Sequence, residues 1–362
     1  MVARRVPKPN SLEWLEWKFP TEDSARKLFE QLVWPDGPYC PHCGCADVWR
    51  FREKGRKSRD GLYECSHCAG QFTVTTKTPM HSTKLPLKVW LRALYLILIS
   101  SKGVSSVILG KQLGVRQATA WKMAHAIREM MDDRDGREPL LGNIVEVDTT
   151  YMGAPPRKKK TKFHRYVYHA PGKGTRRPEV VIAASRDGRV AAEVLRKGEK
   201  GAIARFLDRF VSKDAVIMSD DDKSIAKAVK VFAGHQTVTH SKEEFARDDV
   251  HANTVEGLTA VLKRAQIGVF HHISEMHLQR YVDEIVFRRN QREVVIYQSE
   301  ENGPASFDLR YRNFIEQIGG LLRRAVGRQV RWSVNGGLYW PPPIAPGYTP
   351  APSAARAEAQ VT

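Results

Sequence analysis

The sequence has no apolar run long enough to cross a membrane. Its longest such run, VWLRALYLILI at 89–99, covers about half of the roughly 20 residues that a transmembrane helix needs, and Arg92 interrupts it. The first residues, MVARRVPKPN, lack the apolar core of a secretory signal. We therefore expect a cytoplasmic protein with no membrane partner.

Cysteine and negative charge are also scarce. The five cysteines include two close pairs, which do not suit a disulfide scaffold in a reducing compartment. Only 40 Asp and Glu stand against 58 Lys and Arg, so the formal net charge is +18, while 42% of the residues are hydrophobic. These values predict a globular protein of roughly two to three domains whose partner is a polyanion, with nucleic acid as the leading candidate.

The cysteine pairs have the spacing of a zinc site. Cys40, Cys43, Cys65 and Cys68 form two C-x2-C motifs that can offer four thiolates to a tetrahedral Zn2+, as in a zinc ribbon. Cys45 is an alternative ligand to Cys43. Four thiolates leave no open position for water, so we expect structural zinc in a ribbon that binds DNA or a partner. A redox function of the pairs is the weaker alternative.

Composition and periodicity divide the chain into five segments. The first carries every cysteine, the second has helical patterning, the third alternates strand-like and helical pieces, and the last is rich in Pro and Ala. The predicted segments are a zinc ribbon at 1–80, a helical module at 81–138, an α/β domain at 139–295, a C-terminal extension at 296–340 and a disordered tail at 341–362.

The α/β domain is predicted from two periodicities that alternate along the chain. Strands are expected at 144–152, 178–186, 190–197 and 215–220. Helices are expected at 203–211, 224–232, 254–267 and 274–290.

The helical module contains a pattern typical of a helix-turn-helix. Three helices are expected, from Pro86 to Ile99, over 104–113 and over 117–131, with Gly114 at the turn between the last two. A plain three-helix bundle is the alternative. The residues that would meet DNA lie near the start of the last helix, namely Arg116, Gln117, Thr119 and Lys122.

Three acidic residues occupy positions from which they could converge. Asp148 lies in the apolar strand IVEVDTTY, Asp220 ends the run AVIMSD, and Glu256 falls in the first turn of a helix that Asn253 or Thr254 could cap. Carboxylates suit Mg2+, which prefers oxygen ligands.

These motifs resemble a known family. The cysteine pairs, VEVDTTYMG, SDDDK, THS and above all the block at 251–290 are similar to the zinc-ribbon group of insertion-sequence DDE transposases named IS1595, or ISXO2-like. The resemblance implies an RNase H-like (retroviral-integrase-like) α/β catalytic domain. It also implies that Asp148, Asp220 and Glu256 bind two Mg2+ ions, for which Mn2+ can substitute, and that Asn290 accompanies them in catalysis.

The chain departs from the family pattern at two places. Thr149 stands where the family usually has Glu, and Leu258-Thr259 stands where it has an aromatic pair. Asp221 or Asp222 could replace Asp220 as a metal ligand, although the motif position favours Asp220.

Basic residues gather near the predicted acids. The stretch 157–177 holds nine Lys or Arg and no acid, which favours phosphate contact. The helix after Glu256 adds further cations, and Arg288 and Arg289 are expected near the same DNA. The residues expected to contact phosphates are Arg157, Lys158, Lys159, Lys160, Lys162, Lys263 and Arg264.

These inferences combine into one hypothesis. The chain is expected to be a bacterial transposase that binds double-stranded DNA at the inverted-repeat ends of its element and at the target, cleaves and joins strands by in-line displacement, and acts as a homo-oligomer at the nucleoid. The alternative is a domesticated transposase that has lost the reaction and acts as a DNA-binding regulator. A zinc-ribbon transcription factor would instead scatter the three acids over the surface.

Overall fold

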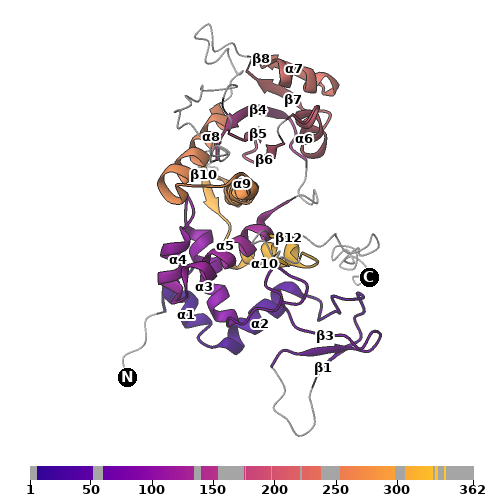
Figure 1. The fold of residues 1–362 in the computed structure, drawn as a ribbon, viewed down its shortest axis with the longest axis vertical. Helices are drawn as coiled ribbons and strands as arrows, with labels where there is room; N and C mark the ends of the chain where they lie inside the picture. Colours follow the sequence, from indigo (N-terminus) through magenta and orange to yellow (C-terminus); the bar gives the residue numbers. More distant parts are fainter. Residues whose placement is uncertain are drawn as a thin grey trace, which may run out of the picture. The chain divides into compact units, whose positions relative to one another are not determined.

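The computed structural model describes residues 6–51, 60–133, 140–153, 175, 177–196, 198–220, 222–237, 253–297, 306–328, 331–332 and 338–339. Contacts divide the chain into two compact units. The first joins Met1–Tyr95, Lys122–Met130 and Asn313–Thr362, and the second joins Leu96–Trp121 and Met131–Arg312. Figure 1 shows the fold coloured along the sequence. Each unit is described by itself.

The first unit begins with two helices that the sequence analysis did not predict. Helix α1 (Leu12–Lys18) starts at Ser11, whose hydroxyl accepts the Trp14 N–H, and α2 (Glu22–Val33) starts at a capping box of Thr21 and Ser24. Helix α10 (Phe314–Ala325) packs against α2. The segment predicted as an extension therefore contributes a helix to the same unit as the ribbon.

The ribbon is a three-stranded antiparallel sheet in the order β1-β2-β3, made of Val48–Arg50, Tyr63–Cys65 and Gln71–Phe72. The rings of Tyr63 and Phe72 stack with centroids 5.7 Å apart, and the Trp34 ring meets both edge-on at 5.4 and 5.9 Å. This aromatic core joins the ribbon to the end of α2. The turn predicted between the first two strands lies mostly outside the described residues.

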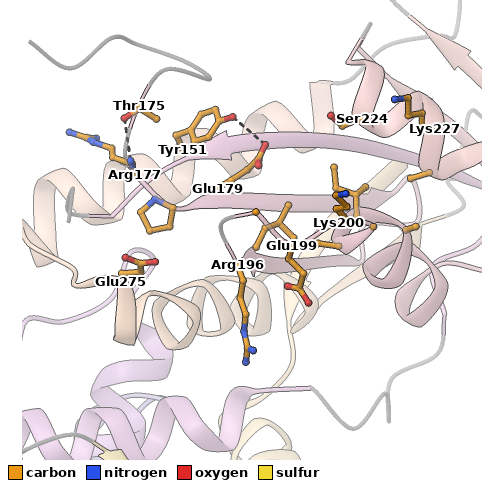
Figure 2. Close-up of a pocket in the computed structure, with 18 residues that line it drawn as sticks. Tyr151, Thr175, Arg177, Glu179, Arg196, Glu199, Lys200, Ser224, Lys227 and Glu275 are labelled. Carbon is orange, nitrogen blue, oxygen red and sulfur yellow. Dashed lines mark hydrogen bonds between the residues drawn. The ribbon is translucent and has the colours of Figure 1, made fainter.

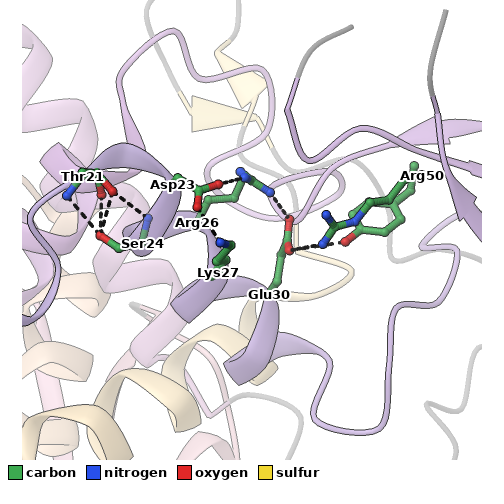
Figure 3. Close-up of polar contacts among 8 residues, drawn as sticks. Thr21, Asp23, Ser24, Arg26, Lys27, Glu30 and Arg50 are labelled. Carbon is green, nitrogen blue, oxygen red and sulfur yellow. Dashed lines mark hydrogen bonds and ion pairs between the residues drawn. The ribbon is translucent and has the colours of Figure 1, made fainter.

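A polar network also joins α2 to the ribbon (Figure 3). Glu30 accepts hydrogen bonds from Arg26 at 3.2 Å and from the Tyr63 hydroxyl at 3.3 Å, and Arg50 lies 3.9 Å from it. Asp23 pairs with the other side of Arg26. The negative charge of Glu30 is thus paired with positive charge where α2 meets the ribbon.

Three helices follow at the predicted positions, as α3 (Leu87–Ile99), α4 (Ser106–Leu113) and α5 (Gln117–Met131). Gly114 ends α4 in the left-handed region at φ +68°. A Cβ at Gly110 would lie 3.0 Å from the Val115 carbonyl oxygen, so a larger residue there would force the turn between α4 and α5 to shift. The boundary between the two units falls within α3 and α5.

The second unit contains a five-stranded mixed sheet in the order β6-β5-β4-β7-β8. Strands β4 (Ile144–Tyr151), β5 (Glu179–Ser185) and β6 (Val190–Leu195) are antiparallel neighbours, while β7 (Val216–Ser219) and β8 (Gly234–Thr237) run parallel to β4. The four predicted strands are confirmed. The sequence analysis missed β8, whose polar sequence GHQT has no apolar alternation.

Helices cover both faces of this sheet (Figure 1). Helices α6 (Ala202–Phe210) and α7 (Lys223–Ala228) pack on one face with Val145 and Val147, and α8 (Asn253–Ala265) and α9 (Glu275–Asn290) pack on the other with Met152. Two short helices, Val229–Val231 and Gln266–Phe270, extend α7 and α8. The predicted helices are confirmed, and the sheet separates two apolar cores.

Two short hairpins complete the described structure. Strands β9 (Arg292–Tyr297) and β10 (Ser306–Tyr311) pair antiparallel, as do β11 (Arg331–Trp332) and β12 (Leu338–Tyr339). The predicted tail at 341–362 lies outside the described residues. Within the described ranges, every helix is too short or too polar to cross a bilayer.

Candidate functional site

Strand β4 places Asp148 on the sheet face that α8 covers. Val145 and Val147 belong to the core on the α6 side, and side chains alternate along a strand, so Glu146 and Asp148 point to the opposite face. The Thr149 backbone N–H donates to Asp148 Oδ1 at 2.6 Å and fixes this carboxylate. Asp148 is half-buried.

Asp220 directly follows β7, which runs parallel to β4 with Ser219 opposite Val147. This register brings Asp220 to the level of Asp148 on the neighbouring strand. Asp220 Oδ1 accepts the Asp222 backbone N–H at 3.1 Å. Asp222 itself caps α7 by accepting the Ser224 N–H at 2.7 Å, so this neighbour already has a structural function. Asp221 lies outside the described residues.

Glu256 lies in the first turn of α8 and is exposed, and Lys263 follows two helical turns later on the same side. Both act on Asp148. Burial is the largest cause that raises the Asp148 pKa to about 6, and the charges of Asp220 and Glu256 raise it further, against the Thr149 hydrogen bond and Lys263. The carboxylates at the end of β7 and on α8 thus lie within electrostatic reach of Asp148 on β4.

The four cysteines form a compact group of potential metal ligands. In the described part of the chain, one ligand atom from each of them lies within 4.8 Å of the others.

The cysteine cluster contains the four predicted residues. The sulfurs of Cys40 and Cys68 lie 3.6 Å apart, as do those of Cys43 and Cys65. Burial tends to raise the pKa of Cys65, but N–H donors from Cys68 and His67 help to bring it to about 6. Cys45 stands outside the cluster, where its sulfur contacts the Asp47 carbonyl and the Ser66 hydroxyl at 3.8 and 3.9 Å. The arrangement suits a closed structural zinc site.

Sequence reasoning missed one residue beside the acids. Glu146 is 0% exposed, and its carboxylate accepts hydrogen bonds from the start of α8. The cap of α8 was expected from Asn253 or Thr254, but the acceptor for the Thr254 and Val255 amides comes from β4. An acid between two buried valines was the only signal of this in the sequence.

Asn290 is engaged away from the carboxylates. Its Oδ1 accepts the Val190 N–H at 2.8 Å, and its Nδ2 donates to the Val190 carbonyl at 2.9 Å. Both polar atoms of this side chain therefore bind the backbone of β6.

The predicted DNA contacts that the structure describes are exposed, apart from Thr119. Arg116, Gln117 and Lys122 are exposed, Thr119 is half-buried, and Gln117 donates to the Ser106 hydroxyl at 2.7 Å. Lys263 and Arg264 are exposed on α8. The other predicted contacts, Arg157, Lys158, Lys159, Lys160 and Lys162, lie outside the described residues.

One expectation about the basic surface is wrong. Arg288 is buried, pairs with Glu284, and donates two hydrogen bonds to the Ile97 carbonyl at 3.2 and 3.3 Å. These bonds satisfy a carbonyl in the last turn of α3. Its guanidinium therefore has a structural partner and is not presented to DNA.

A pocket of about 800 Å³ opens near the end of β4, on the side of α6 and α7 (Figure 2). Tyr151 donates to Glu179 at 3.3 Å along its wall. The lining includes basic side chains such as Lys200 and Lys227 and acidic ones such as Glu179 and Glu199. Its lining is mixed in charge, and Asp148 points to the opposite face of the sheet.

Comparisons with known proteins agree with the motifs. The family model of the ISXO2-like transposase domain matches residues 139–290, and that of the transposase zinc-ribbon domain matches residues 20–71. Together they span more than half of the chain. A relative described as an uncharacterized protein in transposable element ISH50 of Halobacterium salinarum is 24% identical over 289 residues, which cover 75% of this chain and 92% of the relative.

Two solved structures are more distant. The Mos1 strand transfer complex is 15% identical with a TM-score of 0.20, and the Mos1 mariner paired end complex with Mn is 17% identical with a TM-score of 0.21. Each match covers 56% of this chain and 76% of the other. TM-scores this low do not define a shared fold, so the family is assigned from the sequence matches. By those matches, this chain belongs to the ISXO2-like insertion-sequence transposases and carries their zinc-ribbon domain.

Proposed function

We propose that this transposase cleaves and joins DNA strands by in-line phosphodiester displacement, with divalent metal ions held by Asp148, Asp220 and Glu256. One observation carries the proposal. Asp148 on β4 is buried enough to raise its pKa, and the carboxylates of Asp220 after β7 and Glu256 on α8 lie close enough to raise that pKa further. Such clusters of like charge with a raised pKa are typical of functional sites.

The residues fit the metal that the family implies. Three carboxylates offer the hard oxygen ligands that Mg2+ prefers, with Mn2+ as a substitute. A divalent cation would favour the ionised form of Asp148 against burial and against the charges of Asp220 and Glu256, which raise its pKa. Two bound ions would supply activation of the attacking hydroxyl and stabilisation of the leaving oxygen.

The surrounding groups have separate tasks in this proposal. The Thr149 N–H orients Asp148, and the Asp222 N–H orients Asp220. Lys263 and Arg264 extend from the helix that carries Glu256, so they are placed to bind phosphates of the DNA strand beside the carboxylates. The proposal gives Asn290 no catalytic function, because its carboxamide binds the Val190 backbone.

The sheet supports the finer fold assignment. Its order β6-β5-β4-β7-β8, antiparallel for the first three strands and parallel from β4 onward, is the arrangement expected of an RNase H-like domain. In such a sheet, the first strand in the chain lies at the centre and carries the first acid. Asp148 occupies that position on β4.

The remaining parts are proposed to bring DNA to the acids. The zinc ribbon, with structural Zn2+ on its four cysteines, and the turn between α4 and α5 would recognise the element ends, where Arg116 and Lys122 are exposed. Joining two ends calls for at least two copies of the protein. The partner is double-stranded DNA, which accords with a net charge of +18.

A cleavage assay tests the proposal. The probe is a supercoiled plasmid carrying the DNA that flanks this reading frame, incubated with purified protein and Mg2+ or Mn2+. Wild type should nick or linearise it, and Asp148→Ala should lose at least a hundredfold in rate. Asp208→Ala is the matched control, because Asp208 lies on α6 and pairs with Lys213.

The same assay tests the alternative that the protein binds DNA as a regulator and has lost catalysis. If wild type and Asp148→Ala both bind the plasmid and are equally inert with either metal, the chain is a DNA-binding regulator. If both cleave equally, the carboxylates do not carry the reaction.

A further inference from the structure

Glu146 lies on the same face of β4 as Asp148, two residues earlier, and is completely buried. Its Oε2 accepts the backbone N–H groups of Thr254 and Val255 at 2.7 and 3.2 Å. Its Oε1 accepts the Thr254 hydroxyl at 3.0 Å. One carboxylate therefore receives three hydrogen bonds from a helix that begins more than 100 residues later in the chain.

These bonds satisfy groups that the helix cannot satisfy itself. The first N–H groups of an α-helix have no acceptor within it, and Thr254 and Val255 are the second and third residues of α8. A negative charge is also favoured at this end of a helix by the helix dipole. Arg186 Nε lies 3.8 Å from Oε1 and adds positive charge on the other side. The structure thus gives both oxygens of the buried Glu146 carboxylate hydrogen-bond donors from the start of α8.

The position of these bonds matters for the site. Glu256 is the next residue after Val255, so its backbone belongs to the turn that Glu146 holds. The far end of α8 has a second attachment, since Gln266 Oε1 accepts the Gly153 N–H at 2.8 Å just beyond β4. Strand β4 therefore holds α8 near both ends, and Glu146 fixes the end that carries the acid.

We infer that Glu146 is a positioning residue that sets Glu256 against Asp148, so that β4 supplies one metal ligand directly and places a second through its contact with α8. This inference rests on the proposed function, because it concerns the carboxylates assigned there to the metal. Glu146 is not itself offered as a ligand, since both of its oxygens accept hydrogen bonds from α8.

Metal binding measured without DNA tests the inference. Mn2+ affinity of the full chain, determined by titration with electron paramagnetic resonance of free Mn2+, should fall about tenfold in Glu146→Ala, as is typical when a group supporting a ligand is lost. Glu146→Gln keeps one acceptor for the α8 amides and should recover part of this loss. Leu207→Ala, in the core on the other face of the sheet, should lower stability without changing Mn2+ affinity.

A double-mutant cycle separates positioning from general support of the fold. Glu256→Ala should weaken Mn2+ binding, and adding Glu146→Ala to it should weaken binding by less than about twofold more, because the residue to be positioned is gone. Full additivity of the two losses would overturn the inference. If Glu146→Ala does not fold, Thr254→Val removes only the hydroxyl bond, and a two- to threefold loss is expected; unchanged affinity would again overturn it.

The outcomes distinguish the positioning role of Glu146 from the proposed metal site on which it rests. If Glu256→Ala binds Mn2+ like wild type, the metal site assigned to the carboxylates is wrong. If Glu256→Ala weakens binding and Glu146→Ala does not, the metal site stands and the positioning role of Glu146 is wrong.

Discussion

Asn290 closes the outer edge of the sheet at Val190. Its carboxamide exchanges two hydrogen bonds with the Val190 backbone, at 2.8 and 2.9 Å, as a neighbouring strand would. Three helical turns earlier on α9, Gln279 accepts the Val194 N–H at 2.7 Å and donates to the Ala192 carbonyl at 3.2 Å. Because β6 is the last strand on its side, α9 covers an edge that could otherwise pair with another chain.

Replacing Asn290 with Ala should therefore lower the free energy of unfolding by about 1–3 kcal/mol, because a buried N–H and a carbonyl of Val190 lose their partners. Urea denaturation of the metal-free protein measures this effect. Mn2+ affinity should stay at the wild-type value.

Gln279→Ala is the matched control for Asn290→Ala, since it exposes the same edge at Ala192 and Val194. The two variants should have similar losses of stability. An Asn290→Ala protein that is as stable as wild type but fails to cleave DNA would instead assign Asn290 to catalysis, as the family resemblance implies.

Strands β4 to β7 and helices α6 to α9 could be predicted because each has an apolar run or an apolar stripe, which the polar strand β8 lacks. Strand β5 is apolar from Val180 to Ala184, and α6 has a clear apolar stripe of Ile203, Phe206 and Leu207. Helix α2 had the same kind of signal, with Ala25, Leu28, Phe29 and Val33 on one face. It was missed because the cysteine motifs dominated the interpretation of residues 1–80.

The acids of the site could be proposed from motifs, but their supports could not. Glu146 and Thr254 are separated by more than 100 residues, and nothing local marks them as partners. Arg288 differs in the opposite way. Its position beside a family motif predicts a DNA contact, but its partners in the structure are Glu284 and Ile97. Such pairings are set by tertiary packing, which the local pattern of a sequence does not contain.

Removing the zinc ligands should unfold the ribbon. Cys40→Ser and Cys68→Ser are expected to lose the single zinc ion and the β1-β2-β3 sheet, because a small module with few core residues depends on its metal. Metal analysis by mass spectrometry and circular dichroism measure both effects.

Cys45→Ser should keep zinc and structure, because its sulfur contacts only Asp47 and Ser66 among the contacts observed in the described part of the chain. Loss of zinc in Cys45→Ser together with retention in Cys43→Ser would show that Cys45 is the fourth ligand.

The raised pKa of Asp148 should make the metal-free protein less stable as pH rises. The folded pKa is about 6 against an ordinary value of 3.8, so the folded state binds the proton more tightly than the unfolded state does. This contribution is fully present below about pH 4 and is lost as pH rises through about 6. Asp148→Asn, which cannot ionise, should then be more stable than wild type above pH 6, by at most about 3 kcal/mol.

Unfolding by urea at pH 4, 5, 6 and 7 without metal checks this sign. The two proteins should converge at pH 4 and separate above it, and saturating Mn2+ should reduce the difference because binding favours the ionised carboxylate. A constant difference across this range would mean that burial, Asp220 and Glu256 together do not raise the pKa of Asp148.

Lys263 should contribute to DNA binding through phosphate neutralisation. In a plot of log affinity against log salt for a linear duplex, wild type should give a steep negative slope, and Lys263→Ala should reduce its magnitude by about 0.9, the value for one phosphate contact. Fluorescence anisotropy between 50 and 200 mM salt measures the slope. Arg209→Ala removes an equal charge from α6 on the other face of the sheet, where Arg209 pairs with Glu193, and should leave the slope unchanged. Equal changes in both variants would mean that net charge alone attracts DNA, and an unchanged slope in Lys263→Ala would place the bound strand away from α8.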